Sequence, residues 1–145
     1  MKLQRIETPG IAHYAWLLAE GSEAMIVDPS RHVQKYLNAA RDLGTRITHI
    51  VETHRQEDFV MGSAWLAKRT GAKILNGNFD TFGHGDVRLE DDDTFCVGQL
   101  LIRALHTPGH TPESMCYAVY EDENAESAWA IFTGDTLFFG DTGRS

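Results

Sequence analysis

Hydrophobic and polar residues follow two periodicities in the first half of the chain. Two short apolar runs, 12–19 and 24–27, are separated by a polar turn that contains glycine, a pattern typical of a β-hairpin. Apolar residues then recur at helical spacing over 33–43, with Ser30 as a candidate N-cap and Gly44 directly after the last of them. The pattern predicts two strands followed by an amphipathic helix.

The alternation of strand and helix continues before it changes to strands alone. The apolar run 47–51 is typical of a buried strand, residues 60–70 of a helix that ends at Gly71, and residues 72–75 of another inner strand. The second half of the chain shows strand patterns only, and these strands are expected at 94–97, 100–105, 115–120 and 128–133. Strand–helix alternation followed by a run of strands predicts an α/β (α+β) layered domain with helices on the outside of a sheet.

Length and composition indicate how many domains the chain forms and in which cellular compartment we expect it. A chain of 145 residues with 42% hydrophobic and 23% charged residues fits one domain, which we assign to 1–145. Only Cys96 and Cys116 are present, too few for a disulfide framework, and their apolar strand contexts predict that both are buried. The first residues lack the apolar core of a signal peptide, so we expect a cytoplasmic protein.

Charge narrows the kinds of partner. The net charge of −8, without a cluster of Lys and Arg, opposes binding to nucleic acid or to anionic lipid. No apolar run approaches the roughly 20 residues that span a bilayer, so no membrane role is expected. Small molecules are therefore the expected partners. The acidic run 90–93 is most simply a solvated turn.

Three polar segments carry residues that can bind a metal. Each follows a predicted strand, and together they contain His54, His110 and Asp135. Two imidazoles and one carboxylate can form one face of a metal site and leave other coordination positions open. A single His at a strand end is more often a surface or capping residue, and Gly-Asp is an ordinary turn. The residues alone therefore leave metal binding open.

The sequence around these residues resembles the metallo-β-lactamase superfamily. Segments 52–59, 107–114 and 132–138 are similar to the first three metal motifs of that superfamily, in the same order. Residues 24–29 are similar to its strand that ends in Val-Asp-Pro. The resemblance covers nearly the whole chain and implies an αββα sandwich, of which 1–145 would be the N-terminal portion.

The first motif departs from the usual His-x-His-x-Asp-His pattern of the superfamily. Gln56 and Phe59 stand where imidazoles usually stand, whereas His54 and Asp58 are kept. A two-zinc hydrolase uses both missing imidazoles, and its paired ions hold the attacking hydroxide. The resemblance therefore implies that the second metal position is empty.

The residues that remain match the iron ligands of the persulfide-oxidising branch of the superfamily. The resemblance implies one Fe(II) per chain, held by His54, His110 and Asp135, in a dioxygenase that converts a low-molecular-weight thiol persulfide and O2 into sulfite and the thiol. Asp58 is expected either to orient a metal-bound imidazole or to cap the helix that follows. The amino-acid sequence of 107–114 also resembles that of members of this branch that are fused to a rhodanese domain.

Two alternatives of different kinds remain open. One is a zinc-dependent thioester hydrolase of the hydroxyacylglutathione hydrolase type, and the other is a non-catalytic domain that keeps the fold. Arg55, Gln56 and Glu57 have no predicted role. The resemblance stops at Ser145, where relatives continue into a second half. We therefore expect that 1–145 is a fragment of a longer protein, or that a partner chain supplies the missing part. The sheet left open should make the isolated segment a homo-oligomer.

Overall fold

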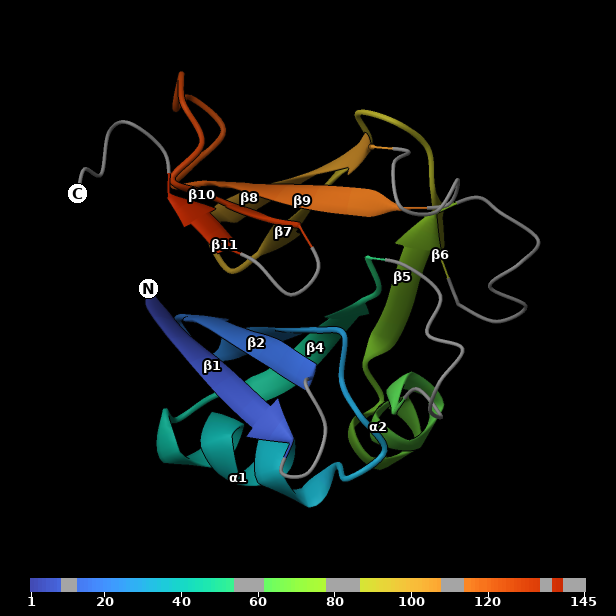
Figure 1. Cartoon of the computed structure of the whole chain (residues 1–145). Helices are drawn as coiled ribbons and strands as arrows, with labels where there is room; N and C mark the ends of the chain where they lie inside the picture. The colour runs from blue at the N-terminus through green and yellow to red at the C-terminus, as the bar shows by residue number, and fades with distance from the viewer. Residues whose placement is uncertain (9–12, 54–61, 78–86, 108–113, 134–136, 140–145) are drawn as a thin grey trace.

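In the part of the chain that the structure describes, two β-sheets pack face to face, and two helices cover the outer face of the first sheet (Figure 1). The computed structural model describes residues 1–8, 13–53, 62–77, 87–107, 114–133 and 137–139. The predicted α/β layering is confirmed, with strand–helix alternation in the first sheet and strands alone in the second.

The first sheet has six strands in the order β1-β2-β3-β4-β5-β6. Its first three strands pair antiparallel, and the pairs from β3 to β6 are parallel. The predicted hairpin is β2–β3, and its turn contains Gly21 at φ 61°. Strands β1 and β6 were not predicted, because one is a largely exposed edge strand and the other has only three residues. The bounds are β1 Lys2–Thr8, β2 His13–Glu20, β3 Glu23–Val27, β4 Arg46–Val51, β5 Lys73–Gly77 and β6 Val87–Leu89.

Both predicted helices are present, with different starts. Helix α1 spans Gln34–Asp42 and helix α2 spans Ser63–Thr70. Ser30 is not the N-cap of α1, since its N–H donates to the Tyr36 hydroxyl at 2.8 Å and Val33 occupies the cap position without a side-chain hydrogen bond. Gly44 and Gly71 follow the two helices at φ 71° and 75°, a conformation that glycine adopts without strain.

The second sheet has five strands in the order β11-β10-β9-β8-β7, and all its pairs are antiparallel. Strand β10 is shorter than predicted, and β11 was not predicted because a three-residue strand has too little periodicity. The bounds are β7 Thr94–Val97, β8 Leu100–His106, β9 Met115–Tyr120, β10 Ala130–Phe132 and β11 Leu137–Phe139.

A β-bulge in β4 decides which side chains face each layer. The pairing of β3 with β4 slips by one residue between Ala24 and Met25, so Thr48 is the extra residue. Ile47 and Ile50 therefore both pack on the helix side, although they are three positions apart, while Val51 faces the second sheet. The bulge therefore determines which side chains at the end of β4 point towards the helices and which point towards the second sheet, directly before the first metal motif.

The prediction that both cysteines are buried is wrong, because they lie on the outer face of the second sheet. Cys96 is exposed and Cys116 is half-buried, because their neighbours in β7 and β9 take the inward-facing positions. The acidic run 90–93 is exposed, as predicted, and Asp92 has a φ of 74° there. Among the described residues, no helix is long and apolar enough to cross a membrane.

Candidate metal centre

The predicted ligands themselves lie outside the described residues. This applies to His54, His110 and Asp135, and also to Asp58. Within the described ranges, no three His, Cys, Asp or Glu side chains lie together as a metal site would require. The ligand set therefore stays a prediction, and the geometry of the site comes from the residues where the three segments begin and end.

The first two segments begin at a direct contact between the sheets. Thr53 is the last described residue before the first segment, and its carbonyl accepts a hydrogen bond of 2.6 Å from the Met115 N–H at the start of β9. Thr107 and Ser114 flank the second segment, and the Thr107 N–H donates to the Ser114 carbonyl at 3.0 Å. Both segments therefore leave the sandwich at the same place.

The third segment starts beside the other two. Phe132, the last residue of β10, is the register partner of Tyr117 in β9. Tyr117 is two residues from Met115, whose N–H bonds the Thr53 carbonyl. The start of the third segment therefore lies within two residues of that hydrogen bond. The described residues next to all three segments thus lie at one edge of the sandwich, as ligands to a single ion require. An imidazole pair with one carboxylate from these segments fits a divalent transition metal.

Asp28 fixes the residue before the first segment. It follows β3, is 2% exposed, and has a φ of 54°, a left-handed conformation that Asp tolerates better than most residues. Its carboxylate accepts hydrogen bonds from the Thr53 N–H, at 2.8 Å, and from the Thr53 hydroxyl. Its own N–H donates to the Val51 carbonyl at 2.9 Å. The end of β4 is therefore held to the end of β3.

Glu52 connects four elements while fully buried. Its carboxylate accepts from the Ser63 hydroxyl at the start of α2, at 3.0 Å, and from the Asn76 amide in β5, at 2.8 Å. Its backbone carbonyl accepts from the Tyr117 hydroxyl in β9 at 2.7 Å. A buried carboxylate is costly unless it is hydrogen-bonded, so the surroundings of Glu52 define one arrangement of β4, α2, β5 and β9.

Burial and charge keep the Tyr117 hydroxyl protonated. Its pKa is raised well above 10.0, first because the phenol is removed from water and then because the charges of Asp28 and Glu52 oppose a phenolate. The hydroxyl therefore remains a hydrogen-bond donor at physiological pH.

The sequence analysis missed the supporting residues of the site. Asp28 entered only as part of a resemblance, and Glu52, Asn76 and Tyr117 received no role. One signal was available, since Glu52 is a charged residue that directly continues the apolar strand 47–51. Its partners could not be inferred, because they lie up to 65 residues away.

Comparisons with known proteins agree with this architecture. No family model matches the chain. A probable metallo-hydrolase of Burkholderia pseudomallei is 38% identical over 71% of the chain and 42% of its own length. A hydroxyacylglutathione hydrolase of Albidiferax ferrireducens is 30% identical over 98% of the chain and 54% of its own length. The chain thus spans about half the length of the curated relatives it matches.

Solved structures give the same family. A metallo-β-lactamase from Staphylococcus aureus superposes with a TM-score of 0.82 and 29% identity, over 92% of this chain and 42% of its own. ETHE1 from Myxococcus xanthus superposes with a TM-score of 0.74 and 26% identity, over 82% of this chain and 54% of its own. The arrangement of the two sheets and the two helices is the metallo-β-lactamase fold. The chain belongs to the metallo-β-lactamase superfamily.

Proposed function

We propose that the protein carrying this chain is a mononuclear iron dioxygenase that oxidises a low-molecular-weight thiol persulfide to sulfite. The observation that carries the proposal is the composition of the first motif. Gln56 and Phe59 replace the imidazoles that a second metal needs, whereas His54 is kept. The described scaffold supports it, because the three segments with the retained ligands begin at one edge of the sandwich.

The proposed reaction balances without another co-reactant. A persulfide, O2 and water give the parent thiol and sulfite with release of two protons, and the two persulfide sulfurs together lose the four electrons that O2 accepts. Iron bound by His54, His110 and Asp135 would supply the one-electron chemistry with O2 that redox-inert zinc lacks. The chain's own residues prepare the metal site: Asp28 and Glu52 hold the backbone directly before His54 in place. Phe59 offers no donor to a second ion.

A thioester hydrolase is the second candidate, and the relatives favour it. Hydroxyacylglutathione hydrolases of several organisms are 30–36% identical to the chain. If this chain shared that activity, the functions of the two missing imidazoles would have to come from other residues. We further propose a thiol-binding second half and a fused or associated rhodanese domain, both of which the resemblance implies. A homo-oligomeric assembly is proposed because the isolated segment would leave a sheet face open.

The decisive experiment compares the two reactions in the same preparation. The complete protein is purified anaerobically, and its metal is identified and counted. O2 uptake and sulfite release are then measured with glutathione persulfide, and hydrolysis with a glutathione thioester. We expect about one iron per chain, O2 uptake with the persulfide, and little thioester hydrolysis.

A gain-of-ligand variant makes the test sharper. Gln56→His combined with Phe59→His restores the usual motif, so this variant should bind a second metal ion, with zinc favoured when it is supplied. The matched control is Gln56→Ala with Phe59→Ala, which should keep one metal. An iron-loaded unaltered protein that hydrolyses the thioester rapidly and takes up no O2 would refute the dioxygenase proposal. Inactivity in both assays would favour a non-catalytic domain.

A further inference from the structure

A hydrogen-bonded bridge joins the two sheets directly beneath the predicted metal segments. It consists of the Tyr117 hydroxyl on the Glu52 carbonyl, at 2.7 Å, and the Met115 N–H on the Thr53 carbonyl, at 2.6 Å. The two acceptors are the last two residues before His54. The two donors lie in the strand that follows the segment containing His110.

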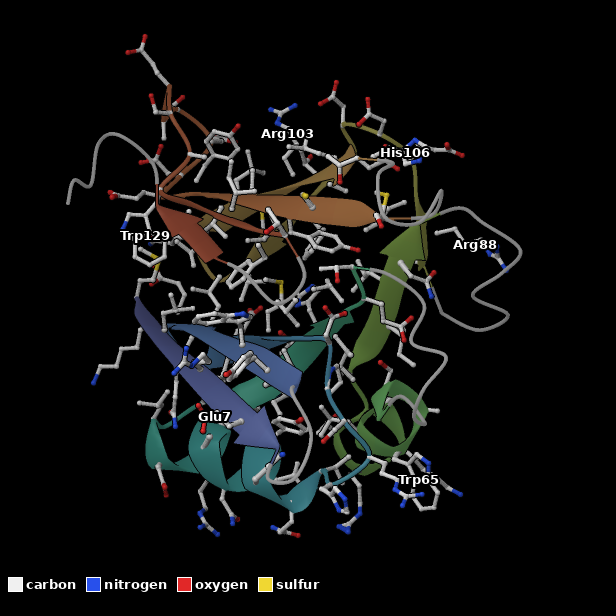
Figure 2. All side chains as sticks on the ribbon, in the orientation of Figure 1. Glu7, Trp65, Arg88, Arg103, His106 and Trp129 are labelled. Carbon is white, nitrogen blue, oxygen red and sulfur yellow. The ribbon has the colours of Figure 1, made fainter. Side chains whose placement is uncertain are left out.

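The position of the bridge is specific. Tyr117 is fully buried and makes this contact from the inner face of β9, where most neighbouring side chains are apolar. A phenol hydroxyl needs a partner in such a layer, and a leucine or phenylalanine would fill the space without one. Figure 1 shows that the ends of β4 and β5 approach the second sheet on the side where β9 begins. Side chains fill the layer between the sheets there (Figure 2).

The carboxylate of Glu52 keeps the acceptor in place. Because Ser63 and Asn76 hold both of its oxygens, the backbone at Glu52 has little freedom to turn away from Tyr117. Displacement of β9 would therefore move the residues before His54 and the segment containing His110 relative to each other. Outer groups that orient metal ligands commonly change metal affinity 10–100-fold when they are removed.

We propose that Tyr117 is a positioning residue, whose bridge to Glu52 sets the distance between the segment of His54 and the segment of His110. This inference rests on the proposed metal site. It adds that the affinity of the site is controlled from the contact between the sheets. Tyr117 itself touches neither metal nor substrate in this role.

The test replaces one hydroxyl and uses a matched control. Tyr117→Phe removes the hydroxyl bond of the bridge and leaves the backbone bond from Met115 to Thr53 in place. Tyr36→Phe removes a hydroxyl from an equally buried tyrosine that bonds Ser30 in the other core. Affinity for Fe(II) is measured anaerobically by competition with a chelator, and stability by the thermal midpoint. We expect Tyr117→Phe to weaken metal binding about tenfold or more. Tyr36→Phe should change it less than about twofold at a similar loss of midpoint.

Hydrogen exchange separates this inference from the proposed function. In Tyr117→Phe, the Met115 amide should lose protection while amides in the centre of β2 and β3 keep theirs. In the unaltered protein, added Fe(II) should raise Met115 protection, because coupling between two sites is reciprocal. Equal metal affinity of Tyr117→Phe and the unaltered protein would overturn the inference. So would a Met115 amide whose protection is altered neither by the substitution nor by added Fe(II). An unaltered protein that binds no metal would overturn the proposed function. The protection of the Met115 amide in Tyr117→Phe would then still show whether the Tyr117 hydroxyl holds β9 to the residues before His54.

Discussion

Replacing Asp28 tests how the fold prepares the first metal segment. In Asp28→Ala, the Thr53 N–H and hydroxyl lose their acceptor inside a region that is 2% exposed. Each buried donor left without a partner costs about 1–3 kcal/mol. The φ of 54° adds about 1–2 kcal/mol, because alanine disfavours the left-handed region. The expected loss is therefore roughly 3–8 kcal/mol, a large share of the ~5–15 kcal/mol typical of a domain.

Two control variants separate these causes. Asp92→Ala changes an aspartate that also has a positive φ, at 74°, but lies in an exposed turn, so the backbone cost of about 1–2 kcal/mol dominates. Its exposed ion pair with Arg103, at 3.6 Å, adds at most about 1 kcal/mol. Asp28→Asn tolerates the backbone and keeps one acceptor for the Thr53 N–H. It should lose about 1–2 kcal/mol because the bonds are no longer charge-assisted.

Urea unfolding followed by tryptophan fluorescence measures all three free energies. The expected order of destabilisation is Asp28→Ala first, then the two controls. If Asp28→Ala and Asp92→Ala lose the same stability, the hydrogen bonds to Thr53 do not hold the end of β4, and the description of the site is wrong.

The remaining predictions concern the metal, the packing of α2 and the assembly. Alanine at His54, His110 or Asp135 should abolish stoichiometric metal binding, whereas Gln56→Ala should do much less, as elemental analysis would determine. Gly62→Ala should cost at least about 3 kcal/mol in urea unfolding, because a Cβ there would lie 1.7 Å from a backbone oxygen. The segment 1–145 should be oligomeric by light scattering, since no described helix covers the outer face of the second sheet and Leu101, Leu105 and Ile131 are only half-buried there; a stable monomer would contradict this.

Local periodicity was sufficient for much of the fold. The hairpin β2–β3, both helices and the strands β4, β5, β7, β8 and β9 follow from hydrophobic spacing and from glycine at helix ends. These features depend on residues that are close in the sequence. The short strands β6 and β11 and the exposed edge strand β1 were missed, because their pairing with neighbours, rather than their own pattern, makes them strands.

The sequence also determined which residues are candidates for the metal, through motifs that each occupy a few consecutive positions. Only the tertiary structure decided what supports them. Asp28 meets Thr53 across 25 residues, and Tyr117 meets Glu52 across 65. Such contacts have no local signature, since a buried polar side chain obtains its partner only when the sheets pack. Ser30 is only six residues from its partner, the buried Tyr36 hydroxyl, yet this bond, and not a helix cap, satisfies it.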